Sequence, residues 1–226
     1  MKSEQEQIKL RYQERDSKEI RPLTLKEAMF KYNLTCERER IYFKRISGHF
    51  GDQISRIKFL EIGAGFGYNL HFMKRMGIPG SNIWANDLME NRLEVLERSF
   101  PEINIIPGDA LTIKEDQMFN LILFSTVFSS ILNSGLRRDL ASKALKLLEE
   151  DGVIIIYDFI YNNPRNQDVK CLKKREIKDL FKDAGKIEFR AATLAPPIGR
   201  KAGNTYNIIN SIFPFLRTHV ISLIYK

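Results

Sequence analysis

Glycines and carboxylates stand at three places in the middle of this sequence, at spacings that suit nucleotide chemistry. A loop reads Glu-Ile-Gly-Ala-Gly-Phe-Gly over 61–67, Asp87 follows Gly63 by 24 residues, and Asp109 comes directly after Gly108. Glycines let a backbone pass close to a ligand without Cβ clashes. A carboxylate at a strand end can accept hydrogen bonds from both hydroxyls of a ribose. Together these features predict a nucleotide-binding site.

The elements that must position these residues are short apolar strands alternating with helices. Seven segments have the pattern of strands: 57–62, 81–88, 103–109, 119–125, 152–159, 186–194 and 219–225. Helical apolar spacing separates most of them, at 67–76, 93–100, 136–149 and 173–185. This alternation predicts an α/β fold with a doubly wound, mostly parallel sheet. Such sheets bind ligands beyond the carboxyl ends of their strands, so the loops there carry the site.

The first 56 residues are polar and have helical spacing, which predicts a helical N-terminal extension before a domain of residues 57–226. Thr24 and Glu27 have the spacing of a capping box, and we expect a helix to begin there. A second helix is expected near 37–49.

Length and composition fit one globular domain with an appendage, since the chain has 226 residues, 43% hydrophobic and 28% charged. No apolar run approaches the roughly 18 residues of a membrane helix. The first residues are charged and resemble no secretion signal. Two cysteines, Cys36 and Cys171, are too few for a disulfide framework. We therefore expect a cytoplasmic protein.

Basic residues gather on the two flanks of the sequence. Residues 1–58 carry 14 Lys/Arg against 9 Asp/Glu, and 151–226 carry 13 against 7, whereas 59–150 carry 9 against 12. Basic flanks are typical of proteins that meet an anionic substrate, a lipid surface or nucleic acid, although they also occur as a solvated surface.

The glycine loop departs from the dinucleotide pattern G-x-G-x-x-G, because its third glycine comes one residue early and Tyr68 follows. The form E-x-G-x-G-x-G resembles motif I of the class I S-adenosylmethionine-dependent methyltransferases. This resemblance covers about residues 57–160. It implies an enzyme with a Rossmann-like seven-stranded sheet whose last strand is antiparallel, and S-adenosylmethionine as its cofactor.

The resemblance also implies roles for single residues. Asp87 would bind the ribose, Asp109 the adenine amino group, and the segment around Tyr12 and Arg15 would cover the cofactor as a lid. Each Asp taken alone also fits a helix cap or a turn. The complete set expected to bind the cofactor is Glu61, Gly63, Gly65, Gly67, Asp87, Leu88, Asp109, Ala110 and Ser125.

The loop after the fourth strand bears on the methyl acceptor. It reads Ser-Thr-Val-Phe-Ser-Ser over 125–130, without the N/D-P-P-Y/F motif of adenine and cytosine N-methyltransferases, and the sequence has no Pro-Cys pair. We therefore expect neither nucleic-acid base methylation nor a nucleic-acid partner.

Polar residues beyond the fifth strand are the candidates for handling the acceptor. If the last strand is antiparallel, its start lies at the same edge as the ends of the other strands. Asp158, Asn162, Arg165, Arg200 and His219 would then converge, although each also has a plain structural interpretation. His219 or Asp158 would act as the base, and Asn162, Arg165 and Arg200 would bind the acceptor.

These same segments resemble small methyltransferases of bacterial surface-glycan biosynthesis. This implies a sugar hydroxyl as the acceptor, on an anionic or lipid-linked glycan or precursor. Methylation of nitrogen or carbon in a small metabolite, and a protein that binds S-adenosylmethionine without catalysis, are the alternatives. No His/Asp cluster requires a metal, and the sequence leaves the oligomeric state open.

Residues 196–218 form an insert between the last two strands, with six large apolar residues: Ile208, Ile209, Ile212, Phe213, Phe215 and Leu216. Such an insert could pack as a cap over the acceptor pocket, form a dimer, or contact the inner face of a membrane peripherally.

Overall fold

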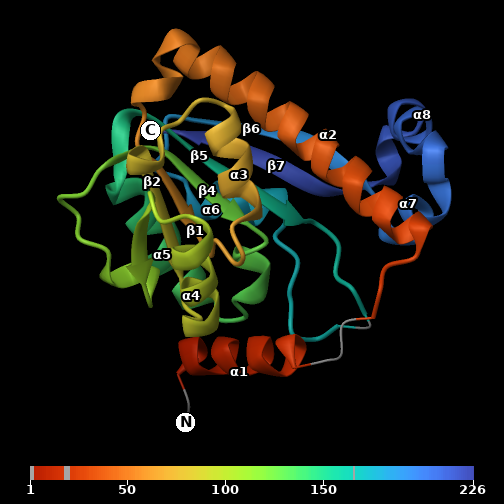
Figure 1. Ribbon diagram of the computed structural model, residues 1–226, viewed down its shortest axis with the longest axis horizontal. Coiled ribbons are helices and arrows are strands. Elements are labelled where there is room, and N and C mark those ends of the chain that lie inside the picture. Colours follow the sequence, from red (N-terminus) through yellow and green to blue (C-terminus); the bar gives the residue numbers. More distant parts are fainter. Residues whose placement is uncertain (1–2, 18–20, 165) are drawn as a thin grey trace.

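The computed structural model describes residues 3–17, 21–164 and 166–226, and shows one twisted sheet between two layers of helices (Figure 1). The strands lie in the order β3-β2-β1-β4-β5-β7-β6. Their bounds are β1 (Phe59–Ile62), β2 (Ile83–Asp87), β3 (Asn104–Pro107), β4 (Phe119–Ser125), β5 (Leu148–Phe159), β6 (Lys186–Leu194) and β7 (Arg217–Tyr225).

The neighbouring strands from β3 to β5 are all parallel: β3 with β2, β2 with β1, β1 with β4, and β4 with β5. Strand β7 runs antiparallel to both β5 and β6. The doubly wound fold with an antiparallel last strand is therefore confirmed. The register places His219 opposite Phe159 on β5 and Ala192 on β6. The start of β7 thus lies at the edge where the parallel strands end, as expected.

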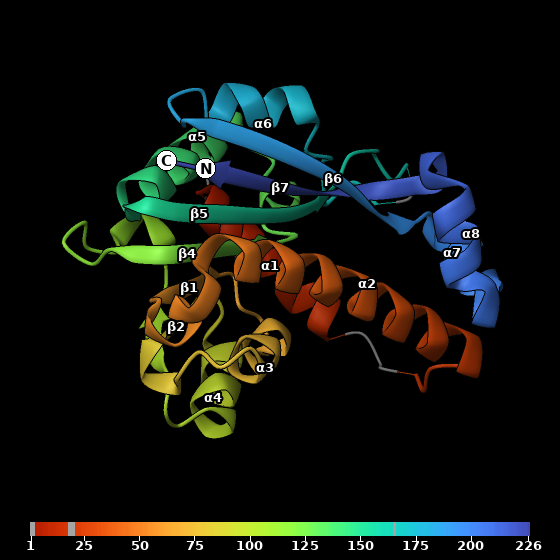
Figure 2. The same ribbon diagram turned by 90° about the horizontal axis from the view of Figure 1, so that it is seen from above.

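Helices cover both faces of the sheet (Figure 2). They are α1 (Glu4–Asp16), α2 (Leu25–Phe50), α3 (Tyr68–Arg75), α4 (Glu90–Ser99), α5 (Ser134–Lys146), α6 (Lys174–Leu180), α7 (Pro196–Ala202) and α8 (Tyr206–Ile212). Single 3-10 turns occur at Gly51–Arg56, Gly80–Asn82, Ala110–Thr112, Phe128–Ser130, Gly203–Thr205 and Pro214–Leu216.

Alternating side chains of the central strands divide the core into two halves. Leu121 and Leu123 of β4 join the cluster under α2, α3 and α4, while Ile122 and Phe124 join the cluster under α1, α5 and α6. All four residues are fully buried. Because β4 is covered on both faces, its sequence is an uninterrupted apolar run rather than an alternating one.

Helix α2 is one continuous helix of 26 residues, where the sequence analysis expected two. The capping box at its start is present: the Thr24 hydroxyl accepts from the Glu27 N–H, and the Glu27 carboxylate accepts from the Thr24 N–H. The two halves of α2 contact different partners. Phe30 packs with Tyr206 of α8, whereas Tyr42 and Ile46 enter the core under α3. This change of partner, rather than a break in the helix, explains the two separate apolar patterns.

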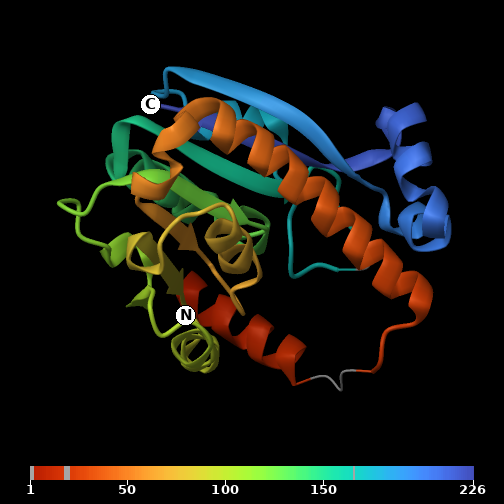
Figure 3. The same ribbon diagram turned by 45° about the horizontal axis from the view of Figure 1, so that its top comes forward.

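The insert between β6 and β7 forms α7 and α8, which pack against the N-terminal half of α2 (Figure 3). Phe30, Leu194 and Tyr206 are the buried residues of this small separate core. Within the described residues, no helix has the length and apolar character needed to cross a bilayer.

Candidate active site

The glycine loop between β1 and α3 bends around the end of the sheet. Gly63, Gly65 and Gly67 have φ angles of +71°, +58° and +80°, a region that favours glycine. The N–H groups of Gly63 and Ala64 donate to the Asn86 carbonyl at 2.8 and 2.9 Å, which ties the loop to β2.

The three glycines serve different purposes. A Cβ on Gly67 would lie 2.5 Å from Cε2 of Phe100, and a Cβ on Gly63 would lie 2.7 Å from Cγ2 of Val127. Nothing lies within 4 Å of the Cβ position of Gly65. Gly67 was expected to bind the cofactor, but it does not line the cavity described next. It allows α3 to begin against the Phe100 side chain.

A cavity of about 340 Å³ lies beside Gly65, at the carboxyl ends of β1 to β4. It brings together eight of the nine residues that the sequence analysis assigned to the cofactor: Glu61, Gly63, Gly65, Asp87, Leu88, Asp109, Ala110 and Ser125. The sequence analysis did not assign four further lining residues to this site: Gln5 and Ile8 of α1, Arg38 of α2 and Arg92 of α4.

Asp87 ends β2 and is buried in the wall of this cavity. Its Oδ2 accepts from the Gly65 N–H at 2.8 Å, and its Oδ1 accepts from the Met89 N–H at 2.9 Å. Arg92 Nη1 lies 3.9 Å from Oδ2. Each carboxylate oxygen has a second lone pair, so Asp87 can hold the loop and still accept from a ligand hydroxyl.

Asp109 follows β3 and accepts from two directions. Its Oδ1 receives the Leu111 N–H at 3.0 Å, as in a helix cap, and its Oδ2 receives the Gln5 side-chain amide at 3.0 Å. An amide N–H₂ is the same kind of donor as the exocyclic amino group of adenine. The Gln5 contact therefore shows that Oδ2 can take such a donor from the α1 side.

Glu61 lies on β1, which neighbours the strand of Asp87 on the side away from Asp109, and its side chain is buried. Its Oε1 accepts from the Asn69 amide at 2.5 Å, while the buried Oε2 has no hydrogen-bond partner among the described residues. Burial raises the pKa of the Glu61 carboxyl to about 8, although the Asn69 hydrogen bond and the Arg38 charge oppose the shift.

Arg38 brings a positive charge from α2 to the cavity wall, and the sequence analysis missed it. Its guanidinium lies 5.1 Å above the centroid of the Tyr157 ring, and its buried Nε has no hydrogen-bond partner in the described chain. Because Arg38 is 23 residues before Glu61, no local motif connects the two side chains. Only the packing of α2 on the sheet brings them to one cavity.

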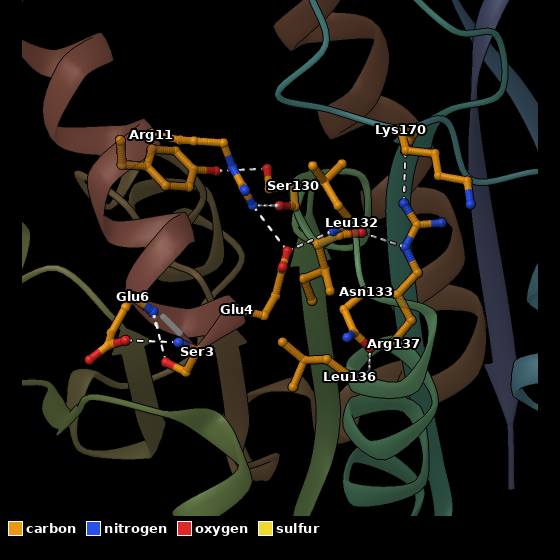
Figure 4. Close-up of polar contacts among 12 residues, drawn as sticks. Ser3, Glu4, Glu6, Arg11, Ser130, Leu132, Asn133, Leu136, Arg137 and Lys170 are labelled. Atoms are coloured by element: carbon orange, nitrogen blue, oxygen red, sulfur yellow. Dashed lines mark hydrogen bonds and ion pairs between the residues drawn. The ribbon is translucent and has the colours of Figure 1, made fainter. Parts of the chain in front are cut away.

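Helix α1 covers the cavity and is fastened to the loop between β4 and α5 (Figure 4). The Glu4 carboxylate accepts from the Leu132 N–H at 2.9 Å, and Arg11 donates to the Ser130 carbonyl at 3.0 Å. The Tyr12 hydroxyl lies 2.8 Å from Oγ of Ser130. The segment around Tyr12 and Arg15, expected as a lid, therefore lies in the wall of the cavity.

Two arginines enclose the Tyr12 ring at this end of α1. The Arg15 and Arg92 guanidinium carbons lie 4.2 and 4.4 Å from its centroid. Arg92 also donates to Asp16 at 2.9 Å, which joins α4 to α1. These contacts build a wall of flat side chains, to which Phe66 adds a ring 5.5 Å from Arg92.

The floor of the cavity beyond β4 holds a strained residue. Thr126 has a φ angle of +58°, which is rare for a β-branched side chain. Its N–H donates to the Tyr157 carbonyl at 2.8 Å, and this bond holds the loop to β5. The strained conformation brings both Ser125 and Thr126 to the cavity surface.

Asp158, expected as a base, does not line the cavity. Its side chain is fully buried and accepts from the Ser129 N–H and its neighbour Phe159 N–H, both at 2.9 Å. Burial raises its pKa to about 6. These hydrogen bonds position the loop that carries Ser129 and Ser130.

His219 lies beside β5 but also stays outside the cavity lining. Its ring stacks on Tyr157, with centroids 5.0 Å apart and planes 12° apart, and Nδ1 lies 3.1 Å from the Thr218 hydroxyl. Burial, together with the Arg38 charge, lowers the His219 pKa to about 4. The imidazole is therefore neutral at physiological pH, and a weaker base than the sequence analysis assumed.

The remaining acceptor candidates do not converge on the cavity. The Asn162 side chain accepts from the Cys171 N–H at 2.8 Å and closes its own loop. Arg200 is exposed on α7 and does not line the cavity. Arg165 lies outside the described residues. No three His, Cys, Asp or Glu side chains of the described ranges gather into a metal-binding group.

The cavity fits an adenosyl group joined to an amino acid. Gly65 leaves open space where a side chain would project, and Asp87 and Asp109 offer carboxylates along one wall. Glu61 offers a carboxyl oxygen and Arg38 an N–H, each buried and unpartnered among the described residues, which suits hydrogen bonds to the ammonium and the carboxylate of one amino-acid group.

Several solved structures share this fold. Magnesium protoporphyrin IX methyltransferase from Synechocystis, solved with bound S-adenosylhomocysteine, matches 99% of this chain and 100% of its own, with a TM-score of 0.65 and 8% identity. A SAM-dependent methyltransferase from Archaeoglobus fulgidus matches 86% of this chain and 99% of its own, at 0.56 and 17%.

The glycopeptide N-methyltransferase MtfA, solved with sinefungin, matches 82% of this chain and 93% of its own, with a TM-score of 0.56 and 13% identity. No family model and no curated protein matches the chain. The chain therefore has the class I methyltransferase fold.

Proposed function

We propose that this protein is an S-adenosylmethionine-dependent methyltransferase. The observation that carries the proposal is the single cavity wall in which the open Gly65 position, Asp87 and Asp109 lie at the ends of three adjacent strands. The bound ligands that the neighbours' names state, S-adenosylhomocysteine and sinefungin, support the same cofactor.

Different residues of the cavity would bind different parts of the cofactor. Asp109 would accept from the adenine amino group in place of Gln5, and Asp87 would accept from the ribose hydroxyls. Glu61 and Arg38 would hold the amino and carboxylate groups of the methionine part. When bound, S-adenosylmethionine supplies a methyl group already activated on a sulfonium, so the protein need only bind, orient and exclude water.

Exclusion of water falls to α1 and the helix that follows β4. Ile8 from α1, together with Leu136 and Leu140 from α5, gives the cavity an apolar side. The contacts of Glu4 and Arg11 to the 130–132 loop keep α1 over that side. A dry, closed cofactor site protects an activated methyl group from hydrolysis.

For the acceptor, we propose a hydroxyl group of a sugar, in a glycan or glycan precursor. The resemblance of the 158–166 and 195–219 segments to glycan-biosynthesis methyltransferases supports it. The hydroxyl side chains of Ser125 and Thr126 at the cavity floor suit a hydroxylated acceptor. The transfer rests on proximity and orientation, and the His219 ring packs on Tyr157 outside the cavity lining.

The test is transfer of a radiolabelled methyl group from S-adenosylmethionine to a panel of nucleotide-linked sugars, sugar acids and amines. We expect label in hydroxylated sugars, in an ether that survives mild alkali, and none with the Gly65→Val variant. Label in amines alone would favour the metabolite N-methyltransferase. Binding of S-adenosylhomocysteine without any transfer would favour a non-catalytic binding protein.

A further inference from the structure

Four large apolar side chains stand exposed together in the insert between β6 and β7. Ile208, Ile212, Phe213 and Phe215, hereafter the cap patch, are 60%, 62%, 41% and 74% exposed. Ile208 and Ile212 are four residues apart on α8 and so share one helix face. The rings of Phe213 and Phe215 are 5.9 Å apart and extend the patch beyond the end of the helix.

The inner side of α8 is already used in packing. Tyr206 and Asn210 are buried, and Ile209 packs into the small core with Phe30. The Tyr206 hydroxyl donates to the buried Glu37 carboxylate at 2.8 Å, which fixes α8 to α2. Helix α8 is therefore apolar on its outer side as well, which a helix that only covers a core does not need.

The segment of the sequence that carries the cap patch is basic and contains no acid. No Asp or Glu follows Glu188 in the sequence, whereas Arg190, Arg200, Lys201, Arg217 and Lys226 do. Arg200 and Lys201 on α7 are exposed, and in the described ranges neither forms an ion pair with a carboxylate. Apolar side chains beside free cations are the combination that binds anionic lipid headgroups.

The position of the patch suits a flat surface better than a second copy of the chain. Helices α7 and α8 project at one end of the molecule, past the ends of β6 and β7 (Figure 2). A stable dimer needs roughly 800 Å² on each partner. Four side chains on a short projecting helix and the turn after it do not offer such an area, but they can enter a bilayer interface.

We propose that the cap patch docks this protein peripherally on anionic bilayers, with Ile212 and Phe215 entering the interface and Arg200 and Lys201 facing headgroups. The inference does not depend on the methyl-transfer proposal. Docking would still matter for methyl transfer, because β6 ends and β7 begins at the same edge of the sheet along which the cofactor cavity lies. Docking would bring that edge to an acceptor carried on a lipid.

The experiment is co-sedimentation of the full chain with phosphatidylcholine vesicles, with and without phosphatidylglycerol. We expect binding to the anionic vesicles that weakens with salt. The double variant Ile212→Ser/Phe215→Ser should lower the partition coefficient by about tenfold or more. Arg200→Gln/Lys201→Gln should reduce both the binding and its salt dependence.

The matched control is Phe43→Ser, which removes a side chain 54% exposed on α2, outside the cap patch. It should bind vesicles as the wild type does, and unchanged melting temperatures should show that the variants fold. Equal binding by the Ile212/Phe215 variant, or no preference for anionic vesicles, would overturn the proposal. So would a dimer in sedimentation velocity that the same double variant abolishes.

Discussion

The two halves of the sheet edge differ in how their residues are brought together. At the ends of β1 to β4, the cavity wall is built from strand-end residues whose partners are mostly nearby, as in the Gly65 to Asp87 hydrogen bond. At the ends of β5 to β7, Tyr157 contacts Arg38, Thr193 and His219, from three different elements. The first half can be recognised from a motif, but the second cannot.

The largest effect should come from closing the cofactor cavity at Gly65. Gly65→Val places a branched side chain at a φ of +58° and into open cavity space, so S-adenosylhomocysteine affinity should fall by more than about a hundredfold. Gly67→Ala is the matched contrast, because its Cβ meets Phe100 instead. It should lower the melting temperature. Calorimetric affinities that rank the two variants the other way would break the distinction between these glycines.

The second-largest loss of affinity is expected at Asp87, since its carboxylate holds the glycine loop and would also bind the ligand. Asp87→Ala removes the acceptor of the Gly65 and Met89 N–H groups, and we expect at least tenfold weaker S-adenosylhomocysteine binding, from hydrogen bonds worth about 1.5–3 kcal/mol each. Titration calorimetry measures the loss. An affinity equal to wild type would remove Asp87 from the ribose site.

A substitution at Arg38, which the sequence analysis missed, tests whether this side chain binds the cofactor or the acceptor. Arg38→Ala should weaken S-adenosylhomocysteine by about tenfold, because a charge-assisted contact to its carboxylate is lost. Affinity for methylthioadenosine, which lacks the amino-acid part, should not change. If both ligands keep wild-type affinity while the acceptor KM rises, Arg38 is an acceptor residue.

Substitution of His219 should have only a small effect on cofactor affinity, unlike the substitutions at the ends of β1 to β4. His219→Ala should leave S-adenosylhomocysteine affinity within about twofold, since the ring lies outside the cavity lining. Because its pKa is lowered to about 4, the imidazole is already deprotonated above about pH 5. The kcat profile between about pH 6 and pH 9 should therefore keep its shape in the variant. Loss of a limb in that range would restore His219 as the base.

The smallest expected effect is a pH dependence of stability from Glu61. A buried carboxyl whose pKa is raised from its ordinary value to about 8 stabilises the fold only while protonated, and this contribution is lost as pH rises through that value. Glu61→Gln stays neutral, so its melting temperature relative to wild type should rise from about pH 5 to about pH 9. Asp158, with its pKa near 6, titrates in both proteins and cancels in the difference. A constant difference would mean that Glu61 is ionised throughout.

The fold and part of the candidate site could be predicted from the sequence. The seven strands were predictable because apolar periodicity is a local signal. The antiparallel β7 and the eight cavity residues were implied by the family resemblance, which rests largely on the local glycine motif. Arg38, Gln5 and Arg92 were not, since α2, α1 and α4 bring these side chains to the cavity only through packing. No spacing in the sequence encodes those contacts.

The predicted site residues that do not line the cavity share one feature. Asp158, Asn162 and His219 were grouped because they lie near one edge, but their side chains hold backbone and neighbouring side-chain groups there. Gly67 shares the motif yet faces Phe100. Position along a strand predicted the edge correctly, but the direction in which each side chain points depends on its three-dimensional neighbours.

Calorimetric titration with S-adenosylhomocysteine and with NAD tests most directly whether the cavity beside Gly65 binds S-adenosylmethionine. We expect one S-adenosylhomocysteine per chain, no heat of binding with NAD, and loss of binding in the Gly65→Val variant. Binding of NAD without S-adenosylhomocysteine, or S-adenosylhomocysteine binding that Gly65→Val leaves intact, would contradict this expectation.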